Sequence, residues 1–161
     1  MIVFTACPDD IPAWNALARE VESLFGASMA DDPAFQQVLQ RKIAQGLAFC
    51  VRQGDAASGA ALCGGLLFST SHRPLYQIGW LAVAGKCQRT GVGGALVEHA
   101  LTLVVPPAEV LVTTFLQDDP GGEQAWRFYQ SLGFEPAELL PGEGPNGETR
   151  QRLRKIVERS E

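Results

Sequence analysis

A mixed α/β (α+β) fold is predicted by three stretches of the sequence. Residues 76–103 read as a buried strand, a glycine-rich loop and a helix, because apolar residues recur at steps of three and four from Val92 onward. Residues 47–52 and 60–70 are β-like runs on either side of a Gly- and Ser-containing turn, which predicts an antiparallel hairpin. Residues 110–115 are β-branched and aromatic, which predicts a buried strand that completes a crossover after the helix.

The N-terminal part is predicted to form one strand and two helices. Residues 2–7 are apolar enough for the strand, and Asp10 is a suitable N-cap for an amphipathic helix that ends at Gly26. A second helix is expected to start at Asp31-Asp32-Pro33 and to close at Gly46, since proline favours the first helical turn and glycine the position after the last.

The C-terminal part is predicted to add a short helix and two strands. Residues 123–132 carry apolar side chains at helical spacing, and Gly133 suits the left-handed position that follows a helix. Residues 134–140 and 148–157 are the strand candidates, separated by a loop rich in proline and glycine. No repeat or linker divides the chain, so a single domain over residues 1–161 is expected.

The composition narrows the class of partner. The net charge is -5 and the pI about 5.0, whereas nucleic-acid and membrane-surface binders need a concentrated basic face, so neither partner is expected. No apolar run approaches the ~20 residues of a membrane span, and the N-terminus lacks a basic signal region, so a cytoplasmic protein is expected. The four cysteines and two histidines lack metal-ligand spacing, so no metal is expected and the cysteines are interpreted as reduced core thiols.

The loop at residues 88–94 is predicted to bind an anion. It ends at a helix N-terminus, where the first backbone N–H groups have no intrahelical acceptor and the helix dipole is positive. Glycines let the main chain approach a ligand closely, so the loop is interpreted as a pyrophosphate cradle. A G-x-G-x-x-G dinucleotide motif is excluded because Leu96 stands where its third glycine is needed, and a P-loop is excluded because Gly85-Lys86 lacks the earlier glycine.

Two linked motifs in the sequence resemble those of the GNAT superfamily of acyl-CoA-dependent N-acyltransferases. In that family a strand ends in Leu-x-Val, and an Arg or Gln follows after five residues, before x-x-Gly-x-Gly/Ala opens a helix. The matching residues here are Leu81-Ala82-Val83, Gln88, Gly91 and Gly93. The family phrase Phe-Tyr-x-x-Leu-Gly-Phe is matched by residues 128–134. The expected order of elements agrees over nearly the whole chain, although the N-terminal third matches only in order and pattern.

The resemblance implies a fold and a cosubstrate. The fold would be a mostly antiparallel central sheet of six to seven strands, splayed between two parallel central strands and flanked by about four helices. The cosubstrate would be acetyl-CoA, with Leu81, Ala82 and Val83 binding the pantetheine arm through backbone groups. The pyrophosphate would be surrounded by Gln88, Arg89, Thr90, Gly91, Gly93 and Gly94. Tyr129 matches the family tyrosine proposed to protonate the coenzyme thiolate; without that motif, a core aromatic is the better interpretation.

The resemblance leaves the general base unassigned. Some family members place a Glu on the central strand six residues before the Val, and Gln77 stands there in this sequence. An amide cannot take up a proton, so either a water chain or another carboxylate would serve. The carboxylate candidates are Asp118, Asp119 and Glu22, although each also reads as a solvated acid or a cap. His72 is interpreted as a surface residue and His99 as a core residue.

Two functions remain open at this point. The first is an N-acetyltransferase that moves an acetyl (acyl) group to a primary amine by direct attack, with no covalent enzyme intermediate. The second is a catalytically silent CoA-binding sensor or interaction module, suggested by Gln77 and by Gly122, where the family often has Asn. The acceptor would be a small-molecule amine or a peptide N-terminus, bound by the first two helices, the loop between them at 26–33 and the loop at 141–147. The acids Glu22, Asp31 and Asp32 would suit a cationic amine, and a homodimer is left open.

Overall fold

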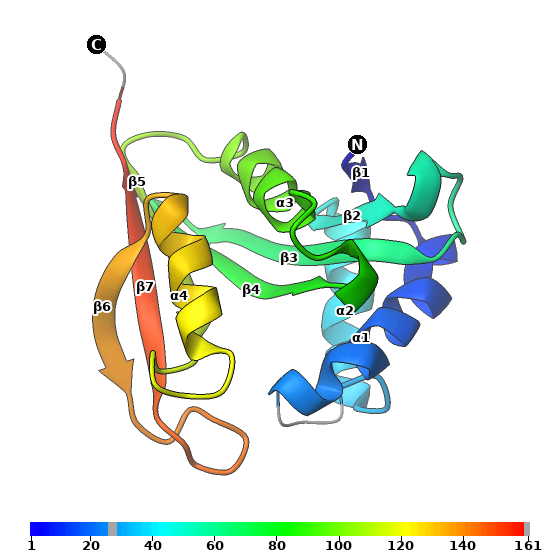
Figure 1. The fold of residues 1–161 in the computed structure, drawn as a ribbon. Helices are drawn as coiled ribbons and strands as arrows, with labels where there is room; N and C mark the ends of the chain where they lie inside the picture. Colours follow the sequence, from blue (N-terminus) through cyan, green and yellow to red (C-terminus); the bar gives the residue numbers. More distant parts are fainter. Residues whose placement is uncertain (26–28, 160–161) are drawn as a thin grey trace. The chain divides into compact units, whose positions relative to one another are not determined.

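A computed structural model of the chain describes residues 1–25 and 29–159 (Figure 1). Its four α-helices in these residues are α1 (Ile11–Phe25), α2 (Pro33–Gln45), α3 (Val92–Leu101) and α4 (Gly122–Ser131). Its seven strands are β1 (Phe4–Thr5), β2 (Ala48–Arg52), β3 (Leu62–His72), β4 (Leu75–Val83), β5 (Ala108–Thr114), β6 (Glu135–Leu140) and β7 (Arg150–Val157). Short 3-10 segments occur at η1 (Pro8–Asp10), η2 (Gln53–Asp55) and η3 (Gly85–Cys87). None of the helices described is long and apolar enough to cross a membrane.

The strands form a mixed sheet in the order β1-β2-β3-β4-β5-β7-β6. β4 and β5 are parallel, whereas β2 pairs antiparallel with β1 and β3, and β7 pairs antiparallel with β5 and β6. The parallel register runs from Leu75 opposite Glu109 to Ile78 opposite Val112, and β4 continues beyond it to Val83. The predicted α+β class with a mostly antiparallel sheet and a parallel central pair is confirmed.

The chain divides into two compact units, and β3 and β4 pass through both. The first consists of Met1–Phe68 and Trp80–Leu103, and the second of Ser69–Gly79 and Val104–Glu161. That these units fold together as one domain stays a prediction.

Two adjacent glycines bring helices close to β3 in the first unit. A Cβ on Gly64 would lie 2.7 Å from Val92 Cγ1 of α3, and one on Gly65 would lie 2.8 Å from the Trp14 ring of α1. Successive residues of a strand face opposite sides of its sheet, so α3 and α1 cover opposite faces of β3 (Figure 1). The two glycines are therefore explained by crowding, and the register shift in the neighbouring strand, between Val51 and Arg52, adds a bulge beside them.

A buried ion pair joins the start of the first unit to β2. Asp10 is fully buried, and its carboxylate accepts hydrogen bonds from Arg52 Nη2 at 2.8 Å and Arg52 Nε at 3.0 Å. It also accepts from the backbone N–H groups of Cys7 at 2.9 Å and Gly59 at 3.4 Å. The Arg52 guanidinium lies over the Phe4 ring, 4.2 Å from its centroid. Asp10 thus closes η1 and binds β2, instead of acting as the predicted N-cap of α1.

The predicted N-terminal strand is longer than β1. Ala6 N still donates to Ala48 O at 2.8 Å, but Cys7 N donates to the Asp10 carboxylate, which turns the chain into η1.

The prediction for α2 is confirmed in detail, because Asp32 accepts from Ala34 N at 2.9 Å and Gly46 adopts the left-handed conformation. The predicted end of the first helix at Gly26 lies outside the described residues.

In the second unit α4 packs on β5. Trp126 Nε1 donates to Phe115 O at 2.9 Å, which fixes the helix to the end of the strand. The helix is followed by Gly133 with a φ of 92°, as predicted, and Phe134 N donates back to Tyr129 O at 3.0 Å. Tyr76 of β4 is buried and its hydroxyl accepts from Val105 N at 3.1 Å, so the chain entering β5 is also held.

Candidate functional site

The glycine-rich loop of the first unit leaves backbone N–H groups available at the start of α3. Gly91 is the N-cap of α3 with a φ of 87°, and Arg89 before it also has a positive φ of 62°. The first hydrogen bond of the helix runs from Ala95 N to Gly91 O at 3.0 Å. The N–H groups of residues 92–94 therefore have no acceptor within the helix, and the positive end of the helix dipole lies there.

The surface around these N–H groups has room for a ligand. A Cβ built on Gly91 or Gly94 meets no protein atom within 4 Å. The side chains of Gln88, Arg89 and Thr90 are exposed, whereas Gly93 is buried against the body of the unit. Open space in front of unpaired N–H donors, with no acidic side chain in the loop, suits a phosphate group. The residues predicted for the cradle are thus brought together, and their contact with a pyrophosphate stays a prediction.

One contact from α1 and one contact within the turn before α3 hold this loop in place. Glu20 of α1 accepts a hydrogen bond from Gly85 N at 2.7 Å, just after β4 ends. Thr90 Oγ1 donates to Cys87 O, which closes the turn before α3. Sequence reasoning missed Glu20, because nothing in the helix pattern distinguishes it from the other acids on the exposed side of α1.

Removing the Glu20 carboxylate should weaken cosubstrate binding slightly. In Glu20→Ala we expect the KM for acetyl-CoA to rise about two- to fivefold with kcat unchanged, because an exposed hydrogen bond contributes roughly 0.5–1 kcal/mol. Steady-state kinetics measure this. Arg19→Ala is the matched control, since Arg19 is exposed on the same helix and pairs only loosely with Asp31 at 3.5 Å; an equal KM for both variants would contradict a role for Glu20 in positioning the loop.

The strand before the loop carries the residues that are predicted to contact the pantetheine arm. Ala82 is buried, whereas Leu81 and Val83 are half-buried on the opposite side of β4. Just after the strand, Ala84 N donates to Cys63 O at 2.8 Å, which holds the end of β4 against β3. The backbone of 81–83 is therefore fixed at one end.

Tyr129 lies on the buried face of α4 in the second unit. Its side chain is 7% exposed, and its ring lies 5.0 Å from that of Phe128 and 5.6 Å from that of Phe134, both edge to face. Burial raises the pKa of Tyr129 well above the ordinary value of about 10, because the phenolate would lose its solvation. The hydroxyl therefore keeps its proton throughout the physiological range, which is the form that a proton donor needs.

Comparison with family models decides the class of protein. A model for the acetyltransferase (GNAT) domain matches residues 44–136, more than half of the chain. The chain belongs to the GNAT acetyltransferase family. The matched range includes β4, the cradle and all of α4. No curated protein sequence matches the chain.

Solved structures share the GNAT fold along the whole chain. Ard1 from Thermoplasma volcanium is 21% identical, with 98% of each chain covered and a TM-score of 0.74. The ribosomal-protein-alanine N-acetyltransferase from Brucella melitensis is 19% identical, with 98% of this chain and all of the other covered and a TM-score of 0.72. Arabidopsis thaliana Naa50, solved with the bisubstrate analogue CoA-Ac-MVNAL, is 16% identical, with 97% and 98% covered and a TM-score of 0.72. At these identities the likeness establishes the fold.

The carboxylates weighed as the general base of this GNAT protein have different surroundings. Asp119 accepts a hydrogen bond from Leu116 N at 3.0 Å and so shapes the turn between β5 and α4. Asp118 is exposed, and Glu22 is half-buried on α1. Gln77 is exposed on β4 in register with Leu111. Asp119 thus has a structural role in this turn, and no base is assigned.

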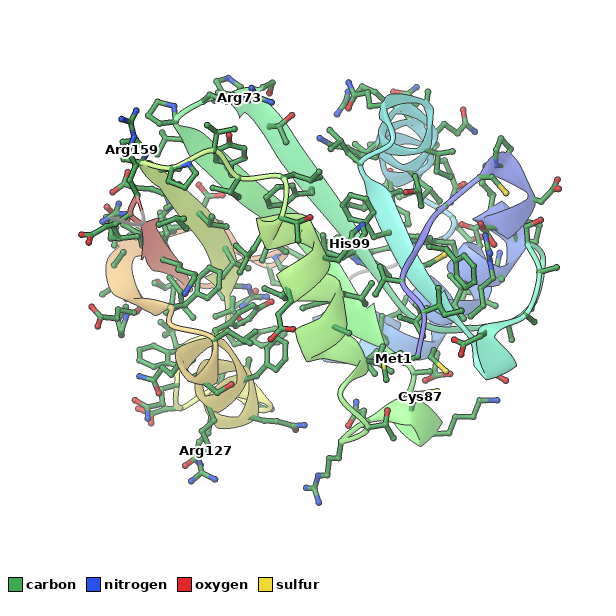
Figure 2. All side chains as sticks on the ribbon, turned by 90° about the horizontal axis from the view of Figure 1, so that it is seen from above. Met1, Arg73, Cys87, His99, Arg127 and Arg159 are labelled. Atoms are coloured by element: carbon green, nitrogen blue, oxygen red, sulfur yellow. The ribbon has the colours of Figure 1, made fainter. Side chains whose placement is uncertain are left out.

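The other polar candidates are explained by local structure. Asp32 caps α2, and Asp31 forms an exposed pair with Arg19, so the acids proposed to attract a cationic amine have partners of their own. The loop at 26–33 is described only from residue 29. His72 is exposed with Nδ1 3.0 Å from Ser71 Oγ, whereas His99 packs edge-on against Phe49 of β2 with centroids 4.7 Å apart (Figure 2). Neither histidine has the setting of a catalytic base.

Gly122 is explained without reference to catalysis. A Cβ at this position would lie 1.9 Å from Leu116 O, and Gly122 N donates to Asp119 O at 2.8 Å. The close approach of backbone to backbone requires glycine here. The absence of Asn at this position therefore does not favour a silent module.

Proposed function

We propose that the protein transfers an acetyl group from acetyl-CoA to a primary amine by direct attack of the amine on the thioester. The observation that supports this most is the open cradle at the start of α3. There the first N–H groups of the helix have no acceptor within it, and the glycines beside them leave free space for a ligand. In a family of acetyltransferases this feature suits the pyrophosphate of the coenzyme. No covalent enzyme intermediate is required, because a neutral amine is nucleophilic enough to attack a thioester that is held and polarised.

Each residue group has a distinct role in this proposal. Main-chain groups of Leu81, Ala82 and Val83 bind the amides of the pantetheine arm, and one of their N–H groups polarises the thioester oxygen. Tyr129, whose phenol is protonated at neutral pH, donates a proton to the departing thiolate, and its position in the transition state has to offset the raised pKa. The residues proposed to hold the pyrophosphate are Gln88, Arg89, Thr90, Gly91, Gly93 and Gly94.

A peptide α-amine is the acceptor we propose first. An α-amino group has a pKa of about 7.7–8.0, so roughly a third of it is neutral at pH 7.5, whereas only about 0.1% of a lysine-like amine with a pKa near 10.4 is neutral. Gln77 cannot remove a proton, and an acceptor of which a substantial fraction is already neutral needs no strong base. Two of the structures with the same fold carry peptide- or protein-directed names, the Brucella melitensis alanine N-acetyltransferase and the Naa50 complex.

A panel of acceptors tests the proposed function. Acetyl-CoA-dependent release of CoA is measured with peptides of varied first residue, the same peptides with blocked N-termini, and small polyamines and aminosugars. We expect turnover with free N-termini alone, with kcat/KM rising with pH until the α-amine is deprotonated near pH 8. Turnover with the small amines alone would show that the acceptor is a small-molecule amine and not a peptide N-terminus. Tight acetyl-CoA binding without turnover of any amine would favour the silent CoA-binding module.

A charge substitution tests the pyrophosphate cradle. We expect Gly94→Asp to bind CoA at least about fivefold more weakly than Gly94→Asn, because a negative charge some 4 Å from a phosphate costs on the order of 1 kcal/mol even in water. Gly94 is chosen because its Cβ has free space and it lacks the positive φ that strains substitutions at Gly91. Titration calorimetry gives the affinities, and thermal melts should show both variants folded. Equal affinities would contradict the assignment of this loop to a phosphate.

A further inference from the structure

Two cysteines from distant parts of the sequence meet beneath the cradle. Cys63 lies on β3, and Cys87 is the last residue of η3, directly before Gln88 (Figure 2). The Cys87 thiol donates to Cys63 Sγ over only 2.7 Å, and both residues are free thiols. No C-x-x-C spacing suggests this pair, because the two residues approach through the packing of β3 against the end of β4.

We propose that Cys63 and Cys87 form a reversible thiol–disulfide modification site. The co-reactant is a small disulfide of the glutathione class. A thiolate of the pair attacks one sulfur of that disulfide and releases one small thiol, and the second cysteine then displaces the other. In sum, the two protein thiols lose two protons and two electrons to form one S–S bond, and the small disulfide is reduced to two thiols.

Backbone hydrogen bonds bring the two cysteines close together. Ala84 N donates to Cys63 O at 2.8 Å, and Cys87 N donates to Ala84 O at 2.9 Å, so one residue hydrogen-bonds to both cysteines. A disulfide needs its sulfurs at about 2.05 Å, so the bond requires only a small further approach. Cys87 is buried and Cys63 half-buried, so the reagent meets Cys63 first.

The surroundings of the pair set the conditions of the reaction. Burial raises the pKa of Cys63 to about 11, because the thiolate would lose its solvation. At neutral pH the Cys63 sulfur therefore holds its proton for most of the time, and its reaction with the disulfide becomes faster as the pH rises towards that value. The pair should stay reduced during brief exposure to air and should respond to a sustained oxidising disulfide.

Oxidation would tie the base of the cradle to β3. Cys87 precedes the cradle directly, and its carbonyl accepts from Thr90 Oγ1, so the link restrains the turn that leads into α3. Because the reduced pair is already in contact, the linked protein should keep the loop conformation. We expect the oxidised protein to melt about 5–10 °C higher, since a cross-link removes freedom mainly from the unfolded chain, and to bind CoA with a Kd within about threefold of the reduced form.

Peptide mapping of the full chain tests the site. The protein is incubated with oxidised glutathione at pH 8.5, quenched with N-ethylmaleimide, digested and analysed by mass spectrometry. We expect one linked peptide pair containing Cys63 and Cys87, lost on treatment with dithiothreitol, while Cys7 and Cys50 are recovered alkylated or unreacted.

Matched variants complete the test. Cys63→Ala and Cys87→Ala should each lose the link and the rise in melting temperature, whereas Cys7→Ala should keep both. Glutathione adducts on Cys63 without a link would overturn the proposal, as would a link that forms only after unfolding in denaturant. The mapping of the unsubstituted protein decides the outcome even where a variant folds poorly.

Discussion

Replacing Tyr129 by Phe is expected to lower kcat by about 10²–10⁴-fold and to leave the Kd for CoA nearly unchanged. A positioned proton donor contributes roughly this factor, and the change removes one oxygen while keeping the ring. The ring contacts with Phe128 and Phe134 should survive, so the free energy of unfolding should change by less than about 1 kcal/mol. Single-turnover kinetics, CoA titration and urea unfolding measure the three quantities.

A neighbouring substitution separates catalysis from packing. Phe128→Leu disturbs the same aromatic cluster without touching the Tyr129 hydroxyl. If Tyr129 is a proton donor, its Phe variant loses turnover at nearly full stability, and Phe128→Leu loses stability with a smaller loss of turnover. A normal rate for Tyr129→Phe would show that Tyr129 is a core aromatic and that the thiolate is protonated by another group.

Replacing Asp10 by Ala is expected to destabilise the protein by about 3–5 kcal/mol, a large fraction of the 5–15 kcal/mol typical of a domain. The change leaves the Arg52 guanidinium buried at 7% exposure without its carboxylate, and it also removes the acceptor of Cys7 N and Gly59 N. Urea unfolding gives the difference. A loss below about 1 kcal/mol would mean that water replaces the carboxylate and that the site is open to solvent.

Two controls sharpen the Asp10 result. Glu123→Ala breaks the exposed pair with Arg127, in which the side chains are 62% and 77% exposed, and should cost less than about 1 kcal/mol. In the double variant Asp10→Ala, Arg52→Met the loss in free energy of unfolding should be smaller than the sum of the losses in the two single variants, because the double variant leaves no buried charge.

The Asp10 pair also predicts a dependence of stability on pH. Burial alone would raise the pKa of Asp10, but the hydrogen bonds from Arg52, Cys7 and Gly59 outweigh it and hold that pKa below its ordinary value. The stabilisation is therefore complete above the ordinary pKa of about 4 and is lost as the pH falls through the lower folded value. Asp10→Asn should lack this part of the acid sensitivity, which unfolding curves across the acidic range would reveal.

Local patterns were enough to predict the elements that carry their own signals. Asp32, Pro33 and Gly46 marked both ends of α2, and the glycine spacing located the cradle at the start of α3, because caps and loops depend on residues close in sequence. Glu20, the Asp10–Arg52 pair and the Cys63–Cys87 contact could not be predicted, since each joins residues that only the packing brings together. Asp10 shows the difference well. Its sequence context suited an N-cap, but the arginine with which it pairs, Arg52, lies 42 residues further along the chain.

The adjacent glycines of β3 have a consequence for redesign of the protein. Because Gly64 contacts the helix that begins at the cradle and Gly65 contacts Trp14 on the other face, enlarging either residue should call for a compensating change in a different helix. A Cβ at position 64 would need a smaller residue at Val92, and one at position 65 a smaller ring at Trp14. The helix that begins at the glycine-rich loop and the first helix can thus be varied separately, provided that this pair of residues is left without side chains.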